Sequence, residues 1–487
     1  MRNNDSLHSL AQNAIQLIKF GELNQVLKLA HDFVERVFTE PLCTSLVAGS
    51  AVLDELCQLV GRLNLASINQ TNLIVNDNSD HPIFVYIVTK VQRSGGHTRV
   101  IEDFIRARPS AQHIILSSEL SGQSDAKYLK EGLAKSANVT FESAHKQGDL
   151  LQRLTWLQRR LLEINPKKIY LFNHHQDSVA IAAVQPEMGF DISFYHHGDH
   201  HLCLGVYLSY AEHIDPHPMG FHECRYGLGI QNVYVPLTLN DKRSRPVEWP
   251  FMEEGTLTTC TAARSNKIEI PYFVSYLDVV PALLKVTGGR HIHIGQLSPW
   301  ALFRIRRGLK HLNVPADRFI YISWVPSVWE ALHTYRVDLY VASFPYGGGL
   351  TLIEAMGAGI PVAMHQHVFS RVLSGIDLAY PEAFSWQTPS ALLEFCAKVT
   401  SEDLRQYAQF ARARYETYHR QTILTDILVS EGKGEISVPK LSGQFQKRPD
   451  EFAAWVESQV SFNHLFQRIV YRLARKIRNK LFLIPSL

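Results

Sequence analysis

The chain has 487 residues, of which 46% are hydrophobic and 20% are charged. A chain of this length exceeds one ordinary core, so we expect two or three globular domains with enough apolar side chains to bury large cores. Because 49 basic residues nearly balance 46 acidic ones and the formal net charge is only +3, bulk charge gives no support to nucleic-acid binding.

The chain begins with a region of helical pattern. Apolar residues recur at helical spacing from Asp5 to about Asn69. We therefore predict an N-terminal helical extension over residues 1–78. A polar, turn-rich linker, Asn76–Pro82, joins this extension to the next unit.

A first α/β unit is predicted over residues 79–245. The β-branched run Ile83–Thr89 is followed by a glycine pair and a helical pattern, which is the typical opening of a Rossmann-like domain. Apolar runs then alternate with helical segments, as in a buried parallel sheet. The expected strands are 83–89, 113–118, 139–143, 168–173 and 191–197, with a helix near 150–164.

A second α/β unit is predicted over residues 246–418. The charged, proline-bearing stretch Asn240–Pro250 interrupts the alternation and is the expected interdomain linker. The expected strands of this unit are 256–263, 290–295, 319–324, 337–343 and 361–366. Two doubly wound domains in tandem create a cleft between the carboxyl ends of their strands, which is where open α/β sheets bind ligands.

The segment Val337–Met364 carries the strongest functional signal. A strand ends, a turn of glycines follows and a helix begins, so free backbone N–H groups and the positive end of a helix dipole suit a diphosphate. Glu354, expected in the first turn of this helix, could accept hydrogen bonds from a ribose diol. The residues that we expect around the diphosphate are Gly347, Gly348, Gly349, Leu350 and Thr351.

This segment resembles the donor site of retaining GT-B glycosyltransferases (glycosyltransferase group 1, family 4-like), where a Gly-rich turn, a glutamate and a small-residue ending like that of Glu354–Val362 occur together. The resemblance covers about Ile83–Tyr418. It implies an α/β fold of two Rossmann-like domains facing across a cleft, sugar transfer from a nucleotide-diphosphate sugar, and ribose binding by Glu354. The chain departs from the pattern at Tyr346, where many such enzymes carry a second glutamate, so the donor-sugar contacts and the stereochemical outcome stay open.

Basic side chains follow the first strand of the second unit. Arg264 and Lys267 could offset the charge that develops on a leaving nucleotide diphosphate, and the resemblance implies this role for an arginine and a lysine here. Solvated charges in a turn are the alternative. The resemblance also places Trp324 where the nucleotide base packs against a loop, although a core tryptophan fits the pattern equally well.

A glycine pair, Gly95 and Gly96, precedes the first helix of the first unit. Alone this is a weak signal. It resembles the N-domain turn of the same family, which lies against phosphate or acceptor, so both glycines are added to the expected binding residues.

Histidines gather after two strands of the first unit. The runs Asn173–Asp177 and His196–His201 both follow strands and are both expected to open at the cleft. Imidazoles and carboxylates there could orient an acceptor hydroxyl, bind donor-sugar hydroxyls or act as a base near neutral pH. The candidate catalytic residues are first His196, His197 and Asp199, and second His174, His175 and Asp177.

Two other classes of function remain open. Tyr195–His200 nearly matches the HxHxDH metal-ligand pattern of metallo-β-lactamase-type hydrolases, but Tyr195 occupies the first ligand position. Cys203 and Cys224 could supply further ligands to a structural metal ion. A nucleotide- or glycan-binding protein without catalysis is the second alternative.

Our prediction is a metal-independent glycosyltransferase of hexosyltransferase type that needs no cofactor besides the nucleotide-sugar donor.

The C-terminal segment, residues 419–487, is predicted to carry a basic amphipathic helix at Ser461–Leu483. Such a helix could lie on an anionic membrane surface or dock on the protein itself. Membrane contact would suit a glycan or lipid-linked acceptor in surface-polysaccharide synthesis, although a protein acceptor also stays open.

The 6 cysteines form no CxxC pair, and the sequence shows neither a signal-peptide core nor an apolar run of roughly 20 residues. We therefore expect a soluble protein in the cytoplasm.

Overall fold

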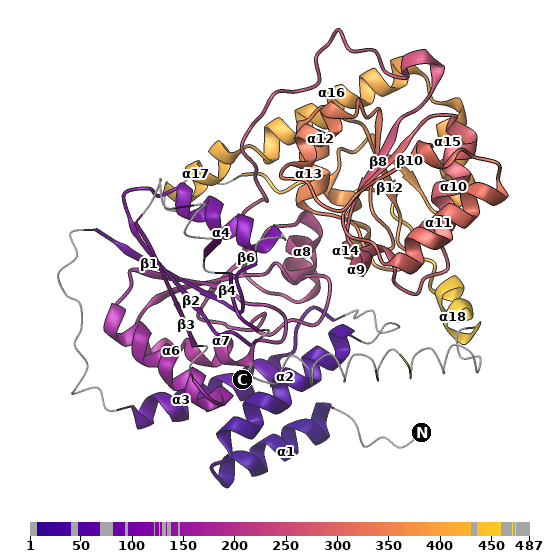
Figure 1. Cartoon of the computed structure of the whole chain (residues 1–487). Coiled ribbons are helices and arrows are strands. Elements are labelled where there is room, and N and C mark those ends of the chain that lie inside the picture. The colour runs from indigo at the N-terminus through magenta and orange to yellow at the C-terminus, as the bar shows by residue number, and fades with distance from the viewer. Residues whose placement is uncertain are drawn as a thin grey trace.

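The chain folds into two α/β domains with three helices at its N-terminal end (Figure 1). This is a computed structural model. It describes residues 7–39, 47–68, 81–92, 96–120, 122–125, 127–128, 133, 138–144, 147–429, 436–458, 470 and 473. No helix among these residues is long and apolar enough to span a bilayer.

The first domain contains a seven-stranded parallel sheet in the order β3-β2-β1-β4-β5-β6-β7. Every side chain of the interior strand β1 is buried, because helices cover both faces of a parallel sheet. The strands are β1 (Ile83–Val88), β2 (Gln112–Ser117), β3 (Asn138–Ser143), β4 (Lys168–Phe172), β5 (Asp191–Tyr195), β6 (Glu212–Asp215) and β7 (Asn232–Tyr234). Its helices include α4 (Gly96–Arg106), α6 (Leu150–Ile164), α7 (Ser178–Ala183) and α8 (Pro218–His222).

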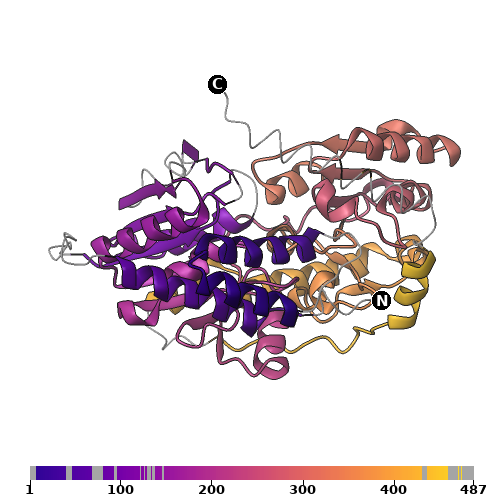
Figure 2. The same ribbon diagram turned by 90° about the horizontal axis from the view of Figure 1, so that it is seen from below.

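The N-terminal helices share the core of the first domain. Helices α1 (Leu7–Lys19), α2 (Leu23–Thr39) and α3 (Ala51–Ser67) cross the underside of the molecule in Figure 2, and their apolar side chains join one cluster with those of β1, α6 and α7. The approach of α3 to α7 is close, since a Cβ atom at Gly61 would lie 2.0 Å from the Ala182 carbonyl oxygen. The buried Asp54 carboxylate also accepts a 2.7 Å hydrogen bond from the Gly205 amide. These helices therefore complete one face of the first domain.

The second domain repeats the architecture with a six-stranded parallel sheet in the order β10-β9-β8-β11-β12-β13. The strands are β8 (Thr259–Ala262), β9 (His291–Ile294), β10 (Phe319–Ile322), β11 (Leu339–Val341), β12 (Val362–His365) and β13 (Phe384–Trp386). The helices are α9 (Ser265–Ile268), α10 (Tyr276–Thr287), α11 (Pro299–His311), α12 (Val328–Thr334), α13 (Leu350–Gly357), α14 (Arg371–Ser374), α15 (Pro389–Lys398) and α16 (Ser401–Tyr418).

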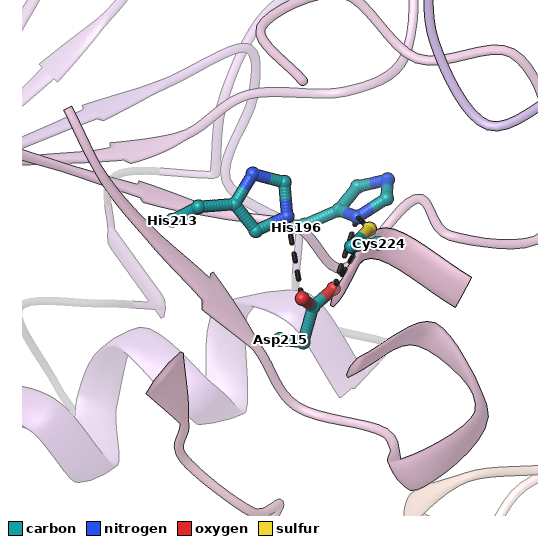
Figure 3. A group of neighbouring side chains, drawn as sticks. All are labelled: His196, His213, Asp215 and Cys224. Atoms are coloured by element: carbon teal, nitrogen blue, oxygen red, sulfur yellow. Dashed lines mark hydrogen bonds and ion pairs between the residues drawn. The ribbon is translucent and has the colours of Figure 1, made fainter. Parts of the chain in front are cut away.

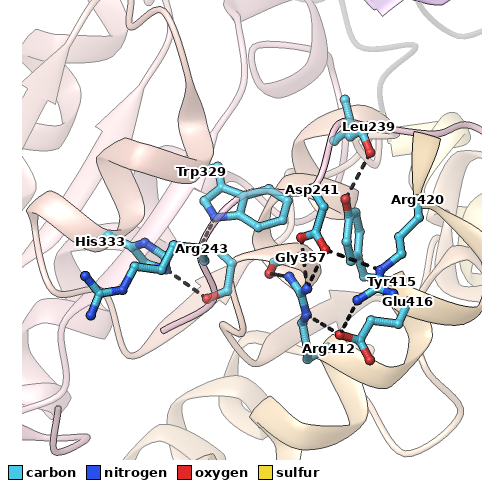
Figure 4. Close-up of polar contacts among 11 residues, drawn as sticks. Leu239, Asp241, Arg243, Trp329, His333, Gly357, Arg412, Tyr415, Glu416 and Arg420 are labelled. Atoms are coloured by element: carbon cyan, nitrogen blue, oxygen red, sulfur yellow. Dashed lines mark hydrogen bonds and ion pairs between the residues drawn. The ribbon is translucent and has the colours of Figure 1, made fainter. Parts of the chain in front are cut away.

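The linker between the domains is fixed by the end of α16 (Figure 4). The Arg412 guanidinium donates to both carboxylate oxygens of Asp241, at 2.8 and 2.9 Å, and to the Gly357 carbonyl at 2.7 Å. The Tyr415 hydroxyl donates to the Leu239 carbonyl at 2.9 Å. One guanidinium thus ties the linker to the C-terminal end of α13, which sets the second domain relative to the first.

The chain then crosses back to the first domain. Helix α17 (Gln421–Val429) packs against α4, and the Arg108 guanidinium donates to the Leu428 carbonyl at 2.9 Å. Residues 436–458 return to the second domain and end in α18 (Pro449–Ser458). Apart from residues 470 and 473, the predicted amphipathic helix at 461–483 lies outside the described residues.

Substitution of Gly61 tests whether the N-terminal helices belong to this core. In Gly61→Ala the new methyl group meets a backbone carbonyl that cannot rotate away, and such overpacking costs about 1–3 kcal/mol. A helical Gly→Ala change alone would stabilise by only about 1 kcal/mol. We expect Gly61→Ala to unfold at a lower urea concentration than the native protein. The midpoint of Gly443→Ala should not fall, because a Cβ atom at Gly443 would meet nothing within 4 Å. Equal midpoints for both variants would contradict the packing of α3 against α7.

Candidate functional site

The two domains meet where the helices that follow their strands begin. A Cβ atom at Gly96, the first residue of α4, would lie 3.0 Å from Leu350 Cδ1 at the start of α13. A Cβ atom at Gly349 would lie 3.2 Å from Leu237 Cδ1 of the first domain. The expected binding residue Gly96 therefore lies against the expected diphosphate residues, whereas Gly95 lies outside the described residues.

The glycine turn before α13 leaves no room for side chains. A Cβ atom at Gly347 would lie 2.7 Å from the Ser374 carbonyl oxygen, and one at Gly348 would lie 2.5 Å from Thr351 Oγ1. The Gly347 amide also donates to the Leu373 carbonyl at 2.8 Å. Glycine is required here because neighbouring backbone and the helix itself approach the turn closely.

Helix α13 begins without a side-chain cap. Its N-cap residue is Gly349, which has no side chain to accept from the first amides of the helix. These N–H groups and the positive end of the helix dipole form a ready binding site for an anion. The structure thus brings the predicted diphosphate-binding residues together at the interdomain junction.

Glu354 lies beyond the first turn of α13, not within it as the sequence suggested, because α13 starts at Leu350. Its Oε1 accepts a 3.3 Å hydrogen bond from the Trp329 amide, in the first turn of α12. Burial raises the pKa of Glu354, although bonds from the amides of Trp329 and Val328 oppose the shift. The carboxylate therefore links the second turn of α13 to the start of α12.

Lys267 contacts the glycine turn. Its Nζ donates to the Gly347 carbonyl at 2.9 Å, and burial lowers the pKa of Lys267 to about 8. Arg264 is exposed and is the N-cap residue of α9, the helix that carries Lys267. Lys267 thus supplies a basic group at the turn itself.

Trp324 is not part of a core. Its side chain is 56% exposed in the loop between β10 and α12. The loop ends at Ser327, the N-cap of α12, so Trp324 lies close in sequence to the amides that Glu354 binds. An exposed indole in the loop before α12 offers the flat apolar surface on which a nucleotide base stacks.

Histidine rings from three strand ends meet in the first domain. The ring of His97, from α4, lies 5.2 Å from that of His174 and 4.3 Å from that of His197. The rings of His175 and His201 continue this group, and the His201 ring lies 5.9 Å from that of Tyr346 in the second domain. We call these five histidines, His97, His174, His175, His197 and His201, the junction cluster. Burial lowers the pKa of His97 and of His201 to about 3, and that of His197 well below its ordinary value. These rings are neutral at physiological pH.

Asp199 forms an ion pair with His217, which is not among the candidates chosen from the sequence. His217 Nδ1 lies 2.8 Å from Asp199 Oδ2, and its Nε2 would lie 3.8 Å from a Cβ atom at Gly349. Burial disfavours both charges, but their attraction outweighs it: the pKa of His217 is raised and that of Asp199 is lowered well below its usual range. The pairing therefore favours the protonated form of His217 beside the start of α13.

Two of the predicted catalytic residues point away from this junction. Asp177 is buried as the N-cap of α7, where it accepts from the Ala180 amide at 2.9 Å and from the hydroxyls of Thr89 and Ser118 at 2.6 Å. His196 is also buried and binds Asp215 instead. Neither opens at the junction as the sequence suggested, because their hydrogen bonds hold them in the interior of the first domain.

The hydrolase alternative required Tyr195, His197, Asp199 and His200 to converge on one metal ion. Among the residues that the structure describes, the side chains close enough together to hold a metal ion are those of His196, His213, Asp215 and Cys224, which include none of these four. Tyr195 instead packs on Phe172 with ring centroids 4.6 Å apart, His197 lies against His97, and Asp199 pairs with His217.

Two doubly wound parallel domains joined in this way define the GT-B glycosyltransferase fold. The HepE protein of Anabaena, solved with UDP and glucose, has a TM-score of 0.54 at 12% identity over 72% of this chain and 99% of that one. HepE with UDP-glucose gives 0.52 at 12% identity over 72% and 98%. The lipopolysaccharide outer core galactosyltransferase WaaB gives 0.48 at 15% identity over 72% and 98%. No family model and no curated protein matches the sequence.

The Asp199–His217 pair predicts a pH-dependent contribution to stability. A raised histidine pKa stabilises the fold below the ordinary value of 6.5, and this contribution is lost as the pH rises through the folded-state pKa. We expect Asp199→Asn to lower the free energy of unfolding by about 2–3 kcal/mol at about pH 6 and by less at about pH 9. Urea unfolding of both proteins at the two pH values measures this. If Asp199→Asn lowered the free energy of unfolding equally at both pH values, the pair would not be a charged one.

Proposed function

We propose that the protein is a glycosyltransferase that transfers a sugar from a nucleoside-diphosphate sugar, with the donor diphosphate at the N-terminus of α13. The observation that carries the proposal is the uncapped start of this helix, which has Lys267 on one side and His217 on the other. Two cations and a set of free amides at one point match a diphosphate and the charge that it gains on leaving. The HepE structures, with UDP-glucose and with UDP and glucose, support this choice of ligand.

The nucleoside is proposed to lie between α12 and α13. Glu354 uses one oxygen for the amide of Trp329, and a carboxylate has further lone pairs that suit the two hydroxyls of a ribose. The exposed indole of Trp324 is the proposed partner of the base. UDP is the first nucleotide to test, because HepE was solved with it.

The sugar and the acceptor are proposed to meet the junction cluster of histidines. His97, His174 and His197 have lowered pKa values because they are buried, so they are present as neutral rings. A neutral imidazole can accept a proton from an acceptor hydroxyl or hold a sugar hydroxyl by hydrogen bonding. Because the protein supplies its own cations at the diphosphate, the proposed transfer needs no metal ion in that position.

The proposed acceptor is a glycan or a lipid-linked glycan, as in surface-polysaccharide synthesis by a hexosyltransferase; a protein acceptor is the alternative. This proposal rests on the basic amphipathic pattern of residues 461–483. Such a segment would bring a cytoplasmic enzyme to the inner face of a membrane, where lipid-linked acceptors lie. Binding of the full chain to anionic vesicles is its direct test.

A nucleotide panel tests the donor site. We expect one of UDP, GDP, dTDP, CMP and ADP to raise the melting temperature of the purified protein, with or without EDTA. At a nucleotide concentration of about 100 Kd the shift corresponds to about 2.7 kcal/mol. Glu354→Ala should abolish the shift through loss of the ribose contact. No shift from any nucleotide would overturn the proposed function.

Two lysine variants test whether Lys267 contributes to nucleotide binding through a local contact or only through the overall positive charge of the protein. We expect Lys267→Met to weaken binding of the selected nucleotide by about 10–100-fold, because a charge-assisted contact contributes about 1.5–3 kcal/mol. Lys285→Met, on the exposed side of α10, should bind as the native protein does. Isothermal titration calorimetry measures both. Equal affinity in the two variants would remove Lys267 from the donor site.

A variant of the junction cluster distinguishes an enzyme from a binding protein. We expect His197→Gln to bind the nucleotide with native affinity but to release it from the matching nucleotide sugar at least about 100-fold more slowly, in line with loss of a group that handles a proton. Release is measured as hydrolysis of the donor, with water as the acceptor. A native protein that binds the nucleotide and never turns over its sugar conjugate would favour the non-catalytic alternative.

A further inference from the structure

A second polar cluster lies inside the first domain, apart from the proposed donor site. It consists of His196, His213, Asp215 and Cys224, all of them buried (Figure 3). His196 follows β5, and His213 and Asp215 share one face of β6 because they are two residues apart. Cys224 lies on the π-helical turn η5 (Glu223–Gly227), which directs its sulfur toward the other three.

The spacing of these atoms matches that around a tetrahedral zinc ion. One ligand atom from each residue lies within 4.8 Å of all the others. His196 Nδ1 is 3.1 Å from Asp215 Oδ1 and 3.5 Å from Cys224 Sγ, and Sγ is 3.6 Å from Oδ1. Ordinary zinc–ligand distances in tetrahedral geometry separate N and O by about 3.3 Å, and S from either by about 3.6 Å.

His213 presents its Nε2 to the same carboxylate. Nε2 lies 3.3 Å from Asp215 Oδ2, and the ring also contacts the Val206 carbonyl. An imidazole held by a backbone carbonyl on one nitrogen can offer the lone pair of the other nitrogen to a cation, which is the usual arrangement of a metal-binding histidine.

The carboxylate is held in place from outside the cluster. Asn232 Nδ2 donates to Asp215 Oδ2 at 2.6 Å, and Arg225 Nε donates to Asn232 Oδ1 at 2.7 Å. This chain of bonds fixes the oxygen that faces away from Cys224 and leaves Oδ1 toward the sulfur. Such support of a ligating carboxylate is typical of metal sites.

We propose that His196, His213, Asp215 and Cys224 bind one Zn²⁺ in a closed structural site. Two neutral imidazoles, a carboxylate and a thiolate give a ligand charge that cancels that of the ion, which removes the cost of leaving a lone carboxylate in the interior. Four protein ligands leave no position for substrate. The ion would join β5, β6 and η5, and so fix the loops that carry His197 and His217 to the junction.

Metal analysis of the full-length native protein tests the proposal directly. Protein expressed with added zinc and purified without chelator should contain about one zinc ion per chain. After exchange with Co²⁺, it should show the visible absorption of a tetrahedral cobalt site and a thiolate-to-cobalt charge-transfer band in the near ultraviolet. Native protein with neither zinc nor these bands would overturn the proposal, without recourse to any variant.

A pair of cysteine variants identifies the ligand. Cys224→Ser should lose the charge-transfer band, whereas Cys203→Ser, which removes another buried thiol outside the cluster, should keep it. A band that persists in Cys224→Ser or disappears only in Cys203→Ser would refute this ligand set. Removal of zinc should lower the melting temperature while the nucleotide-dependent shift persists, so this proposal and the proposed transferase activity succeed or fail separately.

Discussion

The start of α13 lacks a side-chain cap, and the arrangement of the interdomain junction depends on this unsatisfied helix end. Gly349 precedes the helix and offers no side chain to its first amides, and a Cβ atom there would lie 3.2 Å from Leu237 Cδ1 of the first domain. Lys267 and His217 approach the same point from the two domains. The positive potential of a helix N-terminus favours an anion over water. The GT-B fold brings this helix end and the histidines around His97 together.

The linker helps to maintain this geometry. Arg412 bonds Asp241 of the linker and the carbonyl of Gly357, at the opposite end of α13 from the glycine turn. Helix α17 then packs on α4, whose own first residue approaches Leu350. Both ends of α13 therefore contact either the linker or the first domain.

The strands that lie in apolar runs and the glycine turn before α13 were predictable from the sequence because their signals are local. The expected strands 83–89 and 337–343 appear as β1 and the shorter β11, and the helix expected near 150–164 is α6. Three short strands, β6, β7 and β13, were not predicted, since three or four residues of mixed polarity form no apolar run that distinguishes a strand from a loop. Two of the overlooked residues, His213 and Asp215, lie on β6, and His217 follows it directly.

The sequence by itself determined that glycines precede a helix with Glu354 on it, because a chain that must bend sharply beside backbone needs glycine whatever surrounds it. Only the tertiary structure decided how the histidines divide. His196 and His197 are neighbours in the chain just after β5, yet the first bonds to Asp215 and the second packs against His97. Composition cannot reveal this division, because the side on which each ring falls depends on how the chain turns beyond the strand and on which elements pack against each side.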